Sequence, residues 1–167
     1  APSQAQMDRL EQRFLDLYHA PDDDSRRNAL AVLDASMNNY SLILMLEYQG
    51  VRILLPGDTN EQGYTGLDQN LCADLFKIGH HSQLDGINRP LLKRIGPSHV
   101  VCCASSDCRY GSAHPELLQM MQEGGAALYF SDCPDVPPYT NGLSAHQAIE
   151  FRISQGGIFP AYLFPHP

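Results

Sequence analysis

Apolar residues recur at helical spacing in two stretches near the start of the chain, residues 7–20 and 25–35. A proline and three aspartates separate the stretches, and Ser25 is a suitable N-cap for the second helix. The pattern therefore predicts two helices. We expect residues 1–37 to form an N-terminal helical segment that packs on the rest of the chain.

Beyond residue 37 the apolar residues gather in short aliphatic runs bounded by turn residues, a pattern typical of β-strands. Gln49-Gly50 predicts a tight hairpin between the first two runs. The predicted strands are residues 40–48, 50–58, 73–81, 98–106, 126–132, 146–154 and 156–164, and the predicted helices between them lie in residues 86–97 and 114–125. Residues 38–167 are thus expected to form one α/β domain, with a mixed sheet and flanking helices.

The composition narrows the class of protein without naming a function. With 43% hydrophobic and 18% charged residues among 167, the chain is typical of a globular protein. It contains no apolar run of the length that a membrane span needs, and residues 1–12 lack the profile of a signal peptide. We therefore expect a cytoplasmic protein with no membrane partner. A start at Ala1 indicates processing or excision from a longer protein.

The formal net charge of −8 disfavours a broad surface that follows the phosphates of a nucleic acid, because such surfaces cluster Lys and Arg. Nucleic acid as a substrate would need a local basic site. The five cysteines are odd in number and lack Cys-x-x-Cys spacing, which disfavours a disulfide framework or a zinc finger. A redox or structural-zinc protein is the minor alternative, and the accessibility of the thiols would decide it.

Candidate ligands of a metal ion stand where predicted strands end or helices begin. Asp58 ends one strand, His80 and His81 end the next, and His114 begins a helix. Loops converge at strand ends in α/β folds, and carboxylate and imidazole groups bind zinc, manganese or iron. We expect Asp58, one of the two adjacent histidines and His114 to converge on one point.

Each of these residues also has a structural interpretation. Asp58 lies in a Gly-Asp-Thr sequence that suits an Asx turn, and His114 precedes Pro115, where it could belong to a helix cap. The adjacent histidines could occupy two different environments, one buried and one solvated.

Three phrases of the sequence resemble the metallo-β-lactamase superfamily, especially the hydrolase domain of bacterial DNA-uptake channel proteins and its stand-alone relatives. They are "NNYSLILMLEYQGVRILLPGDT", "ADLFKIGHHSQ" and "CRYGSAHPELL". The resemblance covers about residues 38–155 and implies the αββα sandwich of that superfamily. It also implies hydrolysis of a phosphodiester or related ester, as in a nuclease, with two divalent metal ions, zinc or manganese.

The resemblance assigns roles to individual residues. It makes Asp58 the carboxylate that bridges two metal ions and His114 a ligand of the second ion. His80 and His81 become a catalytic pair of which one contacts metal or the phosphate-like substrate, with His80 taken as the metal ligand. The substrate-binding candidates are Arg109, Tyr110 and Ser82, the last standing where the family has glycine.

The principal metal motif of that superfamily, His-x-His-x-Asp-His, is missing from this sequence. None of the seven histidines forms His-x-His. We therefore expect the chain to correspond to the C-terminal half of the fold, as a fragment, a split subunit or a degenerate relative. The expected partner is the missing N-terminal half, a second polypeptide or another copy of the chain. Alone, the chain is expected to be inactive and to bind metal weakly. The alternative function is a non-catalytic binding or scaffold module.

Overall fold

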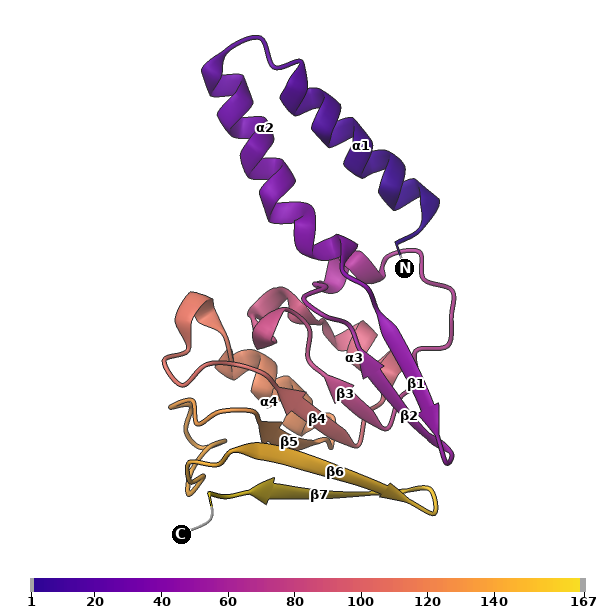
Figure 1. Ribbon diagram of the computed structural model, residues 1–167, viewed down its shortest axis with the longest axis vertical. Helices are drawn as coiled ribbons and strands as arrows, with labels where there is room; N and C mark the ends of the chain where they lie inside the picture. The colour runs from indigo at the N-terminus through magenta and orange to yellow at the C-terminus, as the bar shows by residue number, and fades with distance from the viewer. Residues whose placement is uncertain (1, 166–167) are drawn as a thin grey trace.

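The computed structural model describes residues 2–165 and shows a helical hairpin standing on an α/β body (Figure 1). The predicted α/β class, with helices flanking a mixed sheet, is confirmed. Ala1, His166 and Pro167 are outside the described residues. The first residue of the predicted segment 1–37 and the last two of the predicted segment 38–167 are therefore not described. The helices are α1 (Gln4–Tyr18), α2 (Asp23–Ser36), α3 (Arg89–Ile95) and α4 (Pro115–Glu123). The strands are β1 (Leu44–Tyr48), β2 (Val51–Leu55), β3 (Leu75–Lys77), β4 (His99–Cys102), β5 (Ala127–Phe130), β6 (Ala148–Ser154) and β7 (Gly157–Leu163).

Side-chain caps begin both helices of the hairpin. Ser3 and Gln6 form a capping box, in which the Gln6 side chain accepts from the Ser3 N–H and the Ser3 hydroxyl accepts from the Gln6 N–H. The prediction of Ser25 as the second N-cap is wrong. Asp22 is the N-cap, and its carboxylate accepts from the Ser25 N–H at 2.7 Å. The helix starts earlier because the Asp22 carboxylate is a strong acceptor at that end.

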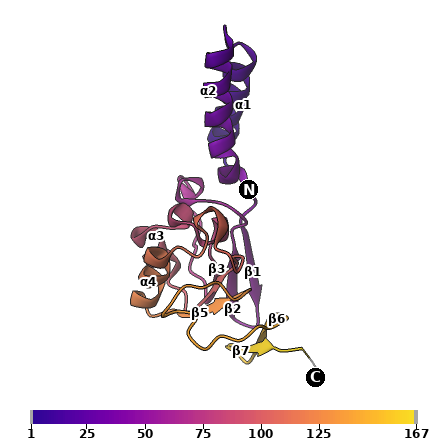
Figure 2. The ribbon, with the colours of Figure 1, turned by 90° about the vertical axis from the view of Figure 1, so that its left-hand side faces the viewer.

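The hairpin meets the body only near its base and does not lie along the domain, as residues 1–37 were expected to do. Figures 1 and 2 show α1 and α2 pointing away from the sheet. Three residues of the two helices are buried, Gln6, Leu33 and Ser36. The Gln6 amide donates to the carbonyl of Gly63 at 3.2 Å and so anchors α1 to the body. None of the helices within residues 2–165 is long and apolar enough to cross a membrane.

The main sheet has the order β1-β2-β3-β4-β5. β1 and β2 form the predicted antiparallel hairpin, and β2 to β5 run parallel. α3 connects β3 to β4 and α4 connects β4 to β5, as parallel neighbours require a crossover. The carboxyl ends of β2, β3 and β4 consequently lie at the same edge, where the candidate site residues follow.

One face of the sheet is fully covered. Leu54, Phe76 and Val100 are aligned across β2, β3 and β4, and all three are completely buried. In Figure 2, α3 and α4 lie on one side of the sheet, and their buried residues join the same hydrophobic cluster. This core fixes the strand ends that carry the site.

The opposite face is covered only in part. The two-stranded sheet β6-β7 packs against β5, with the rings of Tyr129 and Phe151 at 5.2 Å between centroids and the Phe130 N–H donating to the Tyr162 hydroxyl at 3.1 Å. Along β1 the cover is incomplete: Leu44, Leu46 and Tyr48 alternate along that strand and are all exposed, although Val51, which pairs with Tyr48, is buried. An exposed apolar row on an edge strand is unusual for a monomer.

Candidate functional site

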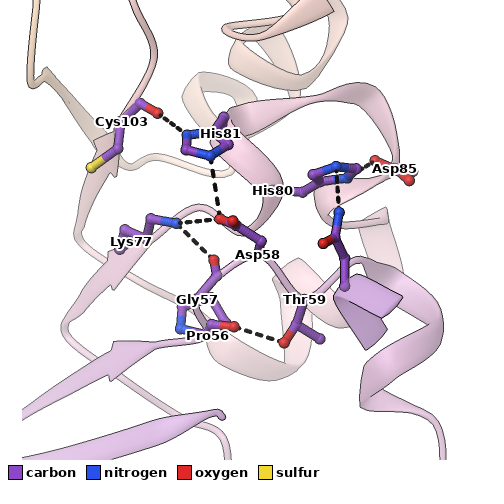
Figure 3. A network of polar contacts seen from close by, with 10 residues as sticks. Pro56, Gly57, Asp58, Thr59, Lys77, His80, His81, Asp85 and Cys103 are labelled. Carbon is purple, nitrogen blue, oxygen red and sulfur yellow. Dashed lines mark hydrogen bonds and ion pairs between the residues drawn. The ribbon is translucent and has the colours of Figure 1, made fainter. Parts of the chain in front are cut away.

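The turn after β2 presents Asp58 at the edge of the sheet (Figure 3). Gly57 adopts a φ of +62°, which favours glycine. Thr59 is fully buried and locks the turn, because both its N–H and its hydroxyl donate to the carbonyl of Pro56. The Asp58 carboxylate points instead toward His81 and Lys77.

The Asp58 carboxylate lies 3.5 Å from Nε2 of His81 and 3.5 Å from Nζ of Lys77. Lys77 also donates to the Gly57 carbonyl at 2.7 Å, so its ammonium fixes both the turn and the carboxylate. Sequence reasoning missed Lys77 as a site residue. Its place four residues before His81, at the end of the strand, was the available signal.

The hydrogen bond of His81 to a backbone carbonyl determines what its ring offers to Asp58. Nδ1 lies 3.0 Å from the carbonyl oxygen of Cys103. Because a carbonyl only accepts, Nδ1 carries a proton and donates it. Nε2 is then the ring nitrogen that faces the Asp58 carboxylate. An imidazole nitrogen and a carboxylate that face one point are suited to hold a proton or a cation between them.

His80 faces away from Asp58 (Figure 3), so the prediction that it ligates metal beside Asp58 is not supported. Its Nε2 lies 2.9 Å from the Asn38 amide nitrogen and its Nδ1 lies 2.9 Å from the Asp85 carboxylate. Both ring nitrogens are therefore engaged in joining the base of the hairpin to the loop after β3. The adjacent histidines do occupy different environments, which was the structural alternative.

His114 and Ser82 meet through the backbone, next to the Asp58–His81 pair. The His114 N–H donates to the Ser82 carbonyl at 2.9 Å, and the Ala113 N–H donates to the His81 carbonyl at 3.2 Å. Ser82 is completely buried, which does not suit its predicted role in substrate binding. Nδ1 of His114 is buried without a hydrogen-bond partner, although polar atoms of this kind are normally paired.

Backbone strain is concentrated where these two segments meet. The residues with a left-handed φ include His80, His81 and Ser82 on one segment, and Cys108, Tyr110 and Ala113 on the other. Left-handed φ is uncommon in residues with a side chain, and such strain gathers at functional sites.

The described residues do not form a metal centre by themselves. Within residues 2–165, no three side chains of His, Cys, Asp or Glu gather into a group that could hold a metal ion. Asp58 and His81 lie close together, and neither His80 nor His114 joins them in a group of three possible ligands. A two-metal centre requires more ligands than this pair, so the chain alone does not fit one.

A cavity of about 590 Å³ opens beside His81. Its lining includes the predicted substrate residues Arg109 and Tyr110, together with Gln83, Cys103, Ala104, Ser105, Ser112 and Ser131. Arg109 contacts the Asp107 carboxylate at 2.8 Å, and this hydrogen bond holds the pKa of Asp107 well below its usual range. The serines of the lining were not predicted, since serine carries no distinctive spacing signal.

All five cysteines are free thiols. Cys102 is completely buried, and burial raises its pKa to about 12, so its thiolate is scarce at neutral pH. We expect iodoacetamide at pH 8 to label the exposed Cys72 at least about 100-fold faster than Cys102 in the native chain. Mass spectrometry of labelled peptides measures the two rates. Equal labelling would favour the redox or structural-zinc alternative.

Comparison of the sequence with those of known proteins gives one informative similarity. No family model matches the chain. Over 131 residues the chain is 31% identical to ComE operon protein 3 of Bacillus subtilis (strain 168). The match covers 77% of this chain and 16% of that protein, so the chain corresponds to a small part of its relative.

Proposed function

We propose that the chain supplies part of the active site of a hydrolase that cleaves a phosphodiester or a related ester. The observation that carries the proposal is the pair formed by Asp58 and His81. The Cys103 carbonyl fixes the ring of His81 so that Nε2 faces the carboxylate at 3.5 Å, beside a cavity large enough for a substrate. In that position Nε2 is suited to take a proton from an attacking water or to return one to a leaving oxygen.

The remaining metal ligands come, in this proposal, from a second polypeptide that carries the missing His-x-His-x-Asp-His segment. Zinc suits a mixed histidine and carboxylate site, and manganese is the alternative. The resemblance of the sequence to hydrolase domains of DNA-uptake channel proteins supports DNA as the substrate. The short match to the longer ComE operon protein 3 supports a role as one piece of a larger assembly.

Hydrolysis of bis-(p-nitrophenyl) phosphate in excess Zn²⁺ or Mn²⁺ tests the proposal. We expect no turnover by the purified chain alone, and turnover when the chain is purified with its complementary polypeptide. In the complex, Asp58→Ala should lower turnover by about 100-fold or more, because the carboxylate lies at the centre of the site. Asp68→Ala, which removes an exposed carboxylate elsewhere, should leave the rate unchanged.

Two outcomes would contradict parts of this proposal. Turnover by the lone, monomeric chain that disappears in Asp58→Ala would show that no second polypeptide is needed. A complex that contains stoichiometric metal and the missing motif, yet hydrolyses neither the test ester nor DNA, would exclude the hydrolase.

A non-catalytic binding or scaffold module is the second candidate. It is favoured by the absence of a three-ligand group within residues 2–165 and by the exposed apolar row on β1. A chain that binds its partner equally well with and without metal, and that never supports turnover, would favour this function.

A further inference from the structure

Another cavity, of about 330 Å³, lies at the base of the helical hairpin, where Figure 1 shows the hairpin joining the body. Its lining comes from α1, from the helical turn Met37–Tyr40 after α2, and from the segment after β2. The lining residues are Gln6, Arg9, Arg13, Asn39, Tyr40, Gln62 and Thr65. None of them lines the cavity beside His81, so a ligand here would be separate from the Asp58–His81 pair.

Arg9 and Arg13 bring two positive charges to this cavity from one face of α1, because residues four apart are neighbours on a helix. Arg9 is exposed and Arg13 is partly exposed, so a ligand can reach both side chains. Within residues 2–165, neither guanidinium forms an ion pair or a hydrogen bond. Every other arginine has a partner, a carboxylate for Arg26, Arg27, Arg89, Arg109 and Arg152 and a backbone carbonyl for Arg52 and Arg94.

No acidic side chain of the lining compensates these two charges. The chain has 19 acidic residues and a net charge of −8, yet every lining residue other than the two arginines is neutral. Asp8 and Asp16, on the same helix, accept hydrogen bonds from Gln4 and Gln12 instead. Like charges four residues apart destabilise a helix. The cavity is therefore locally positive in an acidic protein, which favours an anion as its ligand.

The donors at this cavity suit a compact oxyanion. A guanidinium binds two oxygens of a phosphate or carboxylate at once. The lining holds four neutral side chains able to donate further hydrogen bonds, those of Asn39, Tyr40, Gln62 and Thr65. The volume is at the lower end of the range for small-molecule sites, which indicates a small ligand.

We propose that this cavity binds a small oxyanion with two negative charges, either free phosphate or the phosphate group of a phosphorylated small molecule. Arg9 and Arg13 both donate to its oxygens, so two positive charges meet two negative charges. A phosphate monoester carries close to this charge at neutral pH. The site does not depend on the proposed hydrolase, because its lining is separate from the catalytic pair.

Isothermal titration calorimetry of the full chain in a chloride buffer at about pH 7.5 tests the inference. The probes are inorganic phosphate and glycerol 2-phosphate, with diethyl phosphate as a singly charged analogue and succinate as a dicarboxylate. We expect phosphate or its monoester to bind with a stoichiometry of one per chain, and diethyl phosphate to bind at least about 10-fold more weakly. Tighter binding of glycerol 2-phosphate than of inorganic phosphate would identify a monoester as the ligand, and otherwise the ligand is the free anion.

Arg9→Gln and Arg13→Gln should each weaken binding of the preferred phosphate by about 10-fold, because each removes a charged donor with two N–H groups. Neither substitution removes an ion pair within residues 2–165, so without ligand both variants should unfold at no lower temperature than the wild type, measured by circular dichroism. Lys93→Gln is the matched control. It removes one positive charge from an exposed position on α3 and should leave binding unchanged.

Four results would overturn the inference. The first is no binding of either phosphate at about 10 mM ligand. The second is equal affinity of the wild type and the Arg9→Gln, Arg13→Gln double variant. The third is a loss in Lys93→Gln as large as in the arginine variants, which would reflect net charge alone. The fourth is binding of diethyl phosphate or succinate as tight as that of the preferred phosphate.

Discussion

Gly79→Ala is expected to lower the free energy of unfolding by about 3 kcal/mol, because the new Cβ would overlap a backbone atom. An ideal Cβ at Gly79 would overlap the carbonyl oxygen of Thr59. That oxygen belongs to the turn that presents Asp58, so relief of the clash requires the turn to move. Gly79 has a φ of −64°, which alanine adopts freely, so the steric clash alone accounts for the loss. Urea unfolding measures the change.

Gly142→Ala provides the control for Gly79→Ala. Gly142 has a φ of +79° and nothing within 4 Å of an added Cβ, so this substitution introduces backbone strain without a clash and should cost about 1 kcal/mol. Equal losses in the two variants would show that the turn carrying Asp58 yields readily and that the two site segments are not tightly apposed.

The order of elements could be predicted from the sequence because each strand and helix has a distinct local pattern. The residues at which the strands end could not be predicted in this way. Residues 73–81 read as one strand, but β3 ends at Lys77 and the chain turns left-handed at His80. A left-handed conformation is uncommon in residues other than glycine, and the enrichment of histidine in it is too weak to locate the turn. Tertiary hydrogen bonds hold it here, including the one from the Ala113 N–H to the His81 carbonyl.

The position of the site was likewise partly predictable. Asp58 follows a buried strand and a turn, so its place at the sheet edge follows from the pattern alone. The sequence pattern does not show which of the two adjacent histidines faces Asp58. That depends on Asn38 and Asp85, which bind the ring of His80 and turn it away. Burial of Ser82 also depends on the packing of a distant segment, and no property of residue 82 itself reveals it.

The placement of the hairpin was not predictable for a related reason. A helical stripe of apolar residues shows that a helix has a face to bury, but not what it buries that face against. Here α1 and α2 contact mainly each other, and Phe14 and Leu15 remain exposed. The anchoring contact of Gln6 with Gly63 involves a polar side chain, which hydrophobic periodicity does not register.

Leu54→Ala and Leu46→Ala are expected to lower the free energy of unfolding of the lone chain by very different amounts, because these leucines lie on opposite faces of the same hairpin. Leu46 pairs with Ile53, the neighbour of Leu54 in β2, and side chains alternate along a strand. Leu54 is completely buried and Leu46 is 47% exposed. Leu54→Ala should cost about 3 kcal/mol and Leu46→Ala less than about 1 kcal/mol, measured by urea unfolding.

The same pair of variants also identifies what covers the exposed apolar row on β1. If a second polypeptide completes the sandwich, Leu46→Ala should weaken that complex by about 10-fold while barely changing the lone chain, since its side chain becomes buried only on assembly. If copies of the chain cover the face, stability should rise with protein concentration, and Leu46→Ala should remove that dependence. A large, concentration-independent loss in the Leu46→Ala monomer would contradict both, because it would show that the face is already buried within a single chain.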